Sequence, residues 1–83
     1  DFLRVPIESY YIGITNTVQT SVSSDLGMVE VTVANLTTGE TWSETFDSAV
    51  SPHFLQISGA PGLYEITYLT SFGDLYEGIF TIE

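Results

Sequence analysis

The chain has no cysteine and no lysine, and Arg4 is its only residue of the Lys or Arg type. Without cysteine it can form neither a disulfide nor a thiolate metal site, so the packing of apolar side chains has to stabilise the fold. Eleven acidic residues give a formal net charge of −10. Nucleic acids and anionic membranes are bound largely through Lys and Arg. The composition therefore argues against both as partners, and favours solubility or attraction to basic groups.

Long apolar runs are also absent. No segment reaches the ~18 apolar residues of a membrane-spanning helix, and no leader with a basic and then an apolar part stands at the N-terminus. The chain begins at Asp1 rather than at a methionine, which indicates either a removed leader or a trimmed boundary. A length of 83 residues leaves room for a single domain, residues 1–83, with one core.

Alternation of apolar and polar residues is the main pattern present, and it predicts strands. It is clearest where Val29, Val31 and Val33 alternate with Glu30 and Thr32, so we expect a central strand there. Weaker alternation occurs in three further stretches: Tyr10, Ile12 and Ile14; Val18, Thr20 and Val22; and His53, Leu55 and Ile57. The apolar run from Phe2 to Ile7 is interrupted by Pro6, which indicates an edge strand or one that switches sheets.

The last third of the chain predicts a β-hairpin. A Ser71-Phe72-Gly73 loop, with Gly73 at positive φ, places Thr70 opposite Asp74. The same register pairs Tyr68 with Tyr76, Ile66 with Gly78 and Tyr64 with Phe80, all on one face. We expect this face to be core, with the following residues buried: Val31, Val33, Ile57, Tyr64, Ile66, Phe80 and Ile82.

The turn at Thr37-Thr38-Gly39-Glu40 leaves the position of Trp42 open. A three-residue loop would pair Trp42 with Ala34, on the face opposite the valines, whereas a one-residue bulge would turn it into the core. Short strands at this spacing, joined by Gly and Ser turns, predict an all-β fold, an antiparallel β-sandwich of about seven strands.

Several segments together carry a family resemblance: Asp25-Leu26-Gly27 before the valine strand, Ile57-Ser58-Gly59 before Pro61-Gly62, and Gly73 before Tyr76-Glu77-Gly78-Ile79-Phe80. In this order they resemble a family of small secreted immunoglobulin-like sandwiches of unknown function from Bacteroides and related gut bacteria. The closing pattern is similar to the C-terminal sorting domains of the type IX secretion route. The resemblance implies an immunoglobulin-like fold and an exported protein, secreted or periplasmic or on the outer surface, and it supplies no functional residue.

Catalytic and metal-binding hypotheses are weak. A triad around His53 would need Ser51 or Ser58 together with Asp47 or Asp74. Glu30 and Glu44 could form a carboxylate pair across two strands. Calcium would need three loop carboxylates, Asp25, Asp47 and Asp74, and the Asn35-Leu36-Thr37 segment matches an N-glycosylation pattern. We expect ordinary structural roles for all of them: no enzyme, no cofactor and no metal.

The outer face of the final hairpin is the strongest candidate for a site. It carries Leu63, Leu69, Leu75 and Ile79, with Phe72 at the tip. We predict a binding site formed by Phe72, Leu69, Leu75, Glu65 and Glu77, unless the N-terminal strand or a neighbouring sheet covers this face. The expected function is a non-enzymatic, exported binding or adhesion-type module for a protein or glycan, or for a second copy of itself. The alternative is an accessory or C-terminal sorting domain of a larger surface protein.

Overall fold

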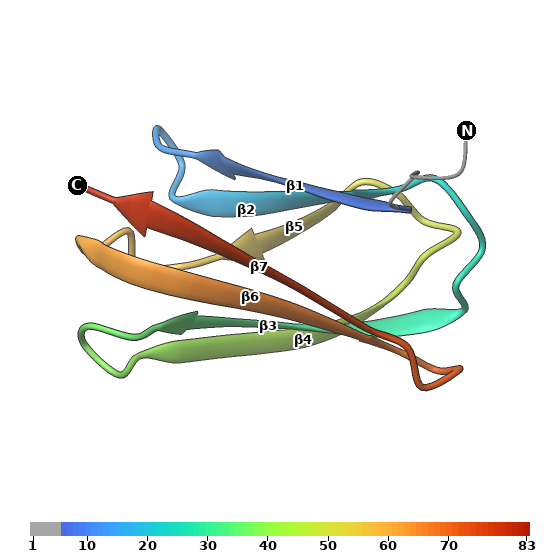
Figure 1. Cartoon of the computed structure of the whole chain (residues 1–83). Helices are drawn as coiled ribbons and strands as arrows, with labels where there is room; N and C mark the ends of the chain where they lie inside the picture. Colours follow the sequence, from blue (N-terminus) through green and yellow to red (C-terminus); the bar gives the residue numbers. More distant parts are fainter. Residues whose placement is uncertain (1–5) are drawn as a thin grey trace.

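The computed structural model describes residues 6–83, which form two antiparallel sheets packed as layers (Figure 1). The three-stranded sheet has the order β1-β2-β5 and the four-stranded sheet the order β4-β3-β6-β7. The strands are β1 (Ile7–Ile12), β2 (Thr17–Val22), β3 (Met28–Asn35), β4 (Thr41–Asp47), β5 (His53–Gln56), β6 (Gly62–Thr70) and β7 (Leu75–Ile82). The prediction of an all-β fold with about seven strands is confirmed. Of the predicted Phe2–Ile7 strand, residues 1–5 lie outside the described part.

The β6–β7 hairpin has the register that its turn predicts. Tyr68 pairs with Tyr76, and Leu69 pairs with Leu75. The backbone N–H of Thr70 donates to the carbonyl of Asp74 at 2.9 Å, and Gly73 has a φ of 89°. Glycine adopts this left-handed conformation without steric cost, so the turn chemistry alone fixes the alignment of both arms.

The central position of β3 is also confirmed, because it pairs with β4 on one side and β6 on the other. Trp42, however, pairs with Val33 rather than Ala34. The loop before it spans residues 36–39, since the Asn35 side chain accepts hydrogen bonds from the N–H groups of Thr37 and Thr38 at 2.9 and 3.1 Å. This one-residue shift directs Trp42 into the sandwich.

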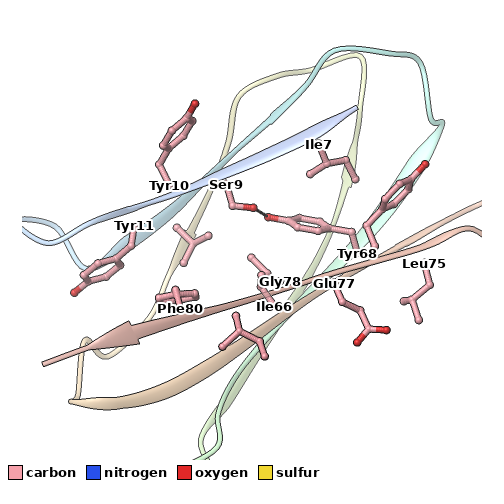
Figure 2. A pocket seen from close by; sticks show the side chains of 13 residues that line it. Ile7, Ser9, Tyr10, Tyr11, Ile66, Tyr68, Leu75, Glu77, Gly78 and Phe80 are labelled. Carbon is pink, nitrogen blue, oxygen red and sulfur yellow. Dashed lines mark hydrogen bonds between the residues drawn. The ribbon is translucent and has the colours of Figure 1, made fainter. Parts of the chain in front are cut away.

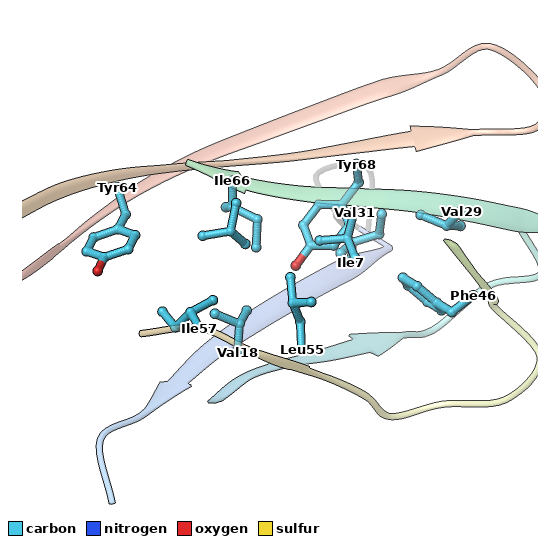
Figure 3. Close-up of a cluster of buried hydrophobic side chains, with 11 residues drawn as sticks. Ile7, Val18, Val29, Val31, Phe46, Leu55, Ile57, Tyr64, Ile66 and Tyr68 are labelled. Carbon is cyan, nitrogen blue, oxygen red and sulfur yellow. The ribbon is translucent and has the colours of Figure 1, made fainter. Parts of the chain in front are cut away.

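The core lies between the two layers (Figure 3). Its buried members are Ile7, Val18, Val29, Val31, Val33, Phe46, Leu55, Ile57, Tyr64, Ile66 and Tyr68. The predicted burial of Phe80 and Ile82 is only partly correct, because both are half-buried and pack against the edge of this cluster. They belong to β7, an edge strand of its sheet, where one flank of each side chain stays open.

The face of β1 that packs against the core is not the one that the alternation of Tyr10, Ile12 and Ile14 suggests. Tyr10 is 54% exposed, and Ile14 lies in the turn after β1 and is 97% exposed. Ile7 and Tyr11 face the core instead. Both faces of β1 carry large side chains, so alternation within the strand does not identify its inner side.

Candidate functional site

The outer face of the four-stranded sheet carries exposed apolar side chains at the end where β6 turns into β7. Leu69 and Leu75 are direct partners across the hairpin and are 45% and 56% exposed. Phe72, in the turn, is 71% exposed. We call Leu69, Phe72 and Leu75 the hairpin ridge. No element within residues 6–83 covers it, so the ridge is a surface feature of the described fold.

The turn that carries Phe72 is held by backbone hydrogen bonds. In addition to the Thr70–Asp74 bond, Gly73 N–H donates to the carbonyl of Thr70 at 3.0 Å, and Ser71 N–H donates to the carbonyl of Met28 at 2.9 Å. The last bond ties the tip of the hairpin to the start of β3. The Phe72 ring is therefore presented from an ordered turn, which lowers the entropy that a contact at this ring would cost.

Met28 extends the apolar surface beyond the residues that the sequence pattern singled out. It is 48% exposed and lies at the start of β3, beside the Ser71 turn. Its position could have been predicted, because Met28 shares the outer face of β3 with Glu30 and Thr32. The missing information was which loop lies next to it.

Two carboxylates accompany the ridge along the same face. Glu77 is exposed and pairs with Thr67, while Glu65 is half-buried and pairs with Ile79. Residues 6–83 contain neither Lys nor Arg. The described fold thus supplies no such side chain to neutralise these carboxylates, and the predicted five-residue set lies on one continuous, acidic and apolar face.

A groove of about 560 Å³ runs along one side of the sandwich, between the edge strands β1 and β7 (Figure 2). This volume lies within the range of ligand pockets, about 300–1,000 Å³. The lining is mostly apolar and aromatic and includes Ile7, Tyr11, Ile66, Tyr68 and Phe80. No pattern in the sequence predicts this groove, because it depends on which two strand edges face each other.

Gly78 lies in the β7 wall of the groove, between Tyr76 and Phe80 on the inner face, and pairs with Ile66. A Cβ at position 78 would approach Cγ2 of Ile66 to 3.3 Å. Because glycine has no side chain, β7 contributes only backbone to the groove wall at position 78, between the side chains of Tyr76 and Phe80. We call this position the Gly78 notch.

Polar groups at the floor of the groove are paired with one another. The Tyr68 hydroxyl lies 2.6 Å from Oγ of Ser9 and 2.7 Å from Oγ1 of Thr20. Burial raises the pKa of Tyr68, while these two hydrogen bonds oppose the rise. The phenol is therefore kept neutral and joins the two sheets, as the dashed Ser9–Tyr68 contact in Figure 2 shows.

Aromatic rings close the far end of the groove. Phe80 stacks on Tyr64 at 4.9 Å between ring centroids and on Tyr11 at 6.0 Å. The Tyr11 hydroxyl also donates to Oδ1 of Asn16 at 2.7 Å. At the mouth, the Tyr10 hydroxyl donates to Glu8, and this hydrogen bond raises the pKa of Tyr10. The groove is thus closed by stacked aromatic rings at one end and has an acidic residue, Glu8, at its rim.

His53 ties together the opposite side of the sandwich. Its Nε2 lies 2.9 Å from Oε1 of Glu44, and its ring stacks on Phe46 at 4.4 Å. The serines of the triad hypothesis are engaged elsewhere: Ser51 accepts a hydrogen bond from Val22 N–H, and Ser58 bonds to Glu40. The structure therefore does not bring a Ser-His-Asp arrangement together at His53.

The carboxylate pair that Glu30 and Glu44 could have formed does not occur. Glu44 pairs with Val31 and shares the inward face of β4, whereas Glu30 pairs with Thr45 on the outer face. The register shift that moved Trp42 inward also moved Glu44 inward, so the two carboxylates lie on opposite faces of the sheet.

The loop aspartates do not converge on a metal site within residues 6–83, where no group of three or more potential metal ligands occurs. Asp25 instead accepts a hydrogen bond from Gly27 N–H, and Asp47 accepts one from Ala49 N–H. Asn35, the acceptor of the N-glycosylation pattern, is fully buried. Its side-chain nitrogen donates to the carbonyl of Pro61 and its oxygen accepts from the β3–β4 loop, so the side chain is inaccessible to glycan transfer in this fold.

Comparison with protein-family models, curated proteins and solved structures finds no match for this chain. Within residues 6–83 there is no helix that is long and apolar enough to cross a membrane.

Proposed function

We propose that this protein is a non-enzymatic binding or adhesion-type module that contacts a protein or a glycan through the hairpin ridge. The observation that carries this proposal is the 71% exposure of Phe72 next to the exposed Leu69–Leu75 pair. Contiguous exposed apolar surface with a polar border is typical of interaction sites, and aromatic side chains are among the residues that contribute most to binding energy.

The charge around the ridge favours a basic partner, or one rich in hydrogen-bond donors. Glu65 and Glu77 lie along the ridge face, and the whole chain carries a formal charge of −10. Such a field speeds up association with a cationic surface and opposes contact with an anionic one. Carboxylates also accept hydrogen bonds from sugar hydroxyls, which keeps a glycan among the candidates.

We also propose that the sandwich is immunoglobulin-like. The strand order supports this proposal: β4-β3-β6-β7 would correspond to strands C′, C, F and G, and β1-β2-β5 to strands A, B and E. A second feature supports this. Tyr64 lies near the start of the strand equivalent to F, and its hydroxyl donates to the carbonyl of Ala60, as in the tyrosine corner of such domains.

Export is part of the same proposal and rests on the sequence resemblance to secreted sandwiches of Bacteroides and related bacteria. The protein would act in the periplasm, at the outer surface or in the medium. The absence of cysteine is compatible with these locations, because the fold needs no disulfide.

The proposal is tested by probing arrays of purified proteins and glycans with the labelled protein, and repeating the screen with Phe72→Ala and Leu75→Ser. Phe54→Ala is the matched control, because Phe54 is 53% exposed on the other sheet. We expect hits that survive Phe54→Ala and are lost with both ridge variants, while circular dichroism shows all variants folded. Hits that survive both ridge variants, or no hits at all, would contradict the proposal.

A further inference from the structure

The β7 strand offers an unused row of backbone hydrogen-bonding groups beside the groove. The Thr70–Asp74 hydrogen bond sets the alternation of the antiparallel ladder, so positions 76, 78 and 80 bond to β6. The N–H and C=O groups of Leu75, Glu77, Ile79 and Thr81 consequently point away from β6. No strand of residues 6–83 pairs with them.

Natural edge strands usually carry features that prevent further pairing, such as lysine, proline, a bulge or a covering element. β7 has neither lysine nor proline, and its pairing with β6 is regular along its length. β4, the other edge strand of this sheet, also has no partner among the described strands on its outer side, but its inner side chains Glu44 and Phe46 are in contact with His53 of the facing sheet. Of these two edges, β7 is the one that borders the groove.

The groove beside β7 suits the side chains of an added strand. Adjacent strands lie about 4.8 Å apart, and every second side chain of a strand points to the same face. A strand paired with β7 would therefore direct alternate residues between the sheets, toward Ile66 and Tyr68. At the Gly78 notch β7 has no side chain, and the apolar Ile66 side chain lies directly behind it, with Cγ2 3.3 Å from the position that a Cβ would take.

Charge identifies the chemistry of the incoming strand. Glu77 borders the groove from the outer face of β7, and Glu8 lies at its rim through its hydrogen bond with Tyr10. A second copy of this chain would bring another formal charge of −10. Lys or Arg at the positions that point away from the groove would instead be attracted.

We propose that β7 accepts an extended segment of another protein as an additional strand, one that is apolar at alternate positions and basic between them. This inference rests on the proposed function, since it specifies how a binding module recognises a protein partner. In strand addition, main-chain hydrogen bonds provide affinity and side-chain pockets provide selectivity. β7 and the groove beside it supply these two elements side by side.

A synthetic nine-residue peptide that alternates valine and lysine is the first probe, with binding to the full chain followed by fluorescence anisotropy. Two control peptides carry either N-methyl groups on the alternate amides facing β7 or glutamate in place of lysine. We expect saturable binding of the lysine peptide and a loss of at least about tenfold in affinity for each control, because one removes the donors and the other reverses the charge. Equal binding of all three peptides would overturn the proposal.

Variants of β7 locate the contact. Ile79→Pro removes an N–H that points away from β6, and Ile79→Ala is its control for the lost side chain. We expect Ile79→Pro, but not Ile79→Ala, to weaken lysine-peptide binding by about tenfold or more. Gly78→Val, which fills the notch, should weaken it similarly. If Gly78→Val does not fold, the Ile79 pair decides, and equal binding by Ile79→Pro and Ile79→Ala refutes strand addition at β7.

The ridge variant Phe72→Ala separates this inference from the proposed function. Phe72 lies outside the β7 ladder, so we expect Phe72→Ala to bind the lysine peptide as the unmodified chain does. If the array finds a partner that depends on the ridge but no peptide binds, strand acceptance fails and the binding module stands. Peptide binding without any ridge-dependent partner would refute the role of the ridge and retain the acceptor edge.

Discussion

His53 Nε2 lies 2.9 Å from Glu44 Oε1 and thereby connects β5 of one sheet to β4 of the other. The His53 ring also stacks on Phe46, which lies in β4 like Glu44. The opposite side of the sandwich, between β1 and β7, contains the groove instead. The edge strands β4 and β5 are thus joined by side-chain contacts, whereas β1 and β7 leave space for a ligand between them.

The first prediction concerns this connection. His53→Ala should lower the free energy of unfolding by about 1–2 kcal/mol, because it removes both an aromatic stack and a hydrogen bond. Glu44→Gln keeps a hydrogen-bond acceptor and should cost less. Urea unfolding followed by tryptophan fluorescence measures both values. Unchanged stability of His53→Ala would mean that the contact contributes nothing to joining the sheets.

The second prediction compares two isoleucines on opposite faces of the β6–β7 hairpin. Ile66 is 4% exposed and Ile79 is 69% exposed. Ile66→Ala should cost about 2–5 kcal/mol through lost packing and the cavity left behind. Ile79→Ala should stay within about 0.5 kcal/mol of the unmodified chain. Phe80→Ala should fall between them, since Phe80 is half-buried, and equal costs for the two isoleucine variants would contradict the assigned faces.

Much of the fold could be predicted from local sequence signals. The Ser71-Phe72-Gly73 turn fixes the hairpin register, and this places Leu69 opposite Leu75 before any tertiary contact is known. The valine alternation likewise identifies β3. Local turn chemistry and period-two patterns act over a few residues, so they can be read from the chain directly.

Other features depend on side chains or on distant segments. The shift of Trp42 depends on the buried Asn35 side chain, which lengthens the β3–β4 loop through two hydrogen bonds. The His53–Glu44 contact joins strands of different sheets. The groove exists because the edges β1 and β7 face each other. No local pattern indicates which distant strands lie next to each other, so the groove could not be predicted. The ridge could be predicted, because it depends only on the register of one hairpin.

The third prediction concerns Tyr68. Burial raises its pKa above the ordinary value of about 10, so its neutral form is favoured in the folded state. Stability from this group is fully present below pH ~10 and is lost as the pH rises through the folded-state pKa, because the unfolded chain ionises first. Tyr68→Phe should therefore lose less stability above pH 10. An unchanged alkaline loss in this variant would contradict the assignment.

The same variant has a cost at neutral pH. Phenylalanine leaves Ser9 and Thr20 without the hydroxyl they contact, and Thr20 is buried. We expect Tyr68→Phe to lower the free energy of unfolding at pH 7 by about 1–2 kcal/mol, measured by urea unfolding. A gain in stability at this pH would mean that the hydrogen-bonded phenol destabilises the core.

The fourth prediction concerns the net charge of −10. Repulsion among the carboxylates should weaken the fold at low ionic strength, so added NaCl should raise the melting temperature. CaCl2 at matched ionic strength should have the same effect, because we expect screening rather than a specific site. A larger effect of calcium at sub-millimolar concentration would point to a metal site that the described carboxylates do not form.

The most direct test of the account is a two-dimensional ¹H–¹⁵N NMR titration of the full chain with the alternating lysine–valine peptide. The account predicts that the largest shift changes occur at the amides of Leu75, Glu77 and Ile79, which point away from β6. The amides of β4 and β5, on the side where His53 contacts Glu44, should change little. Changes concentrated in β4 and β5, or no changes at saturating peptide, would contradict the claim that β7 accepts an added strand.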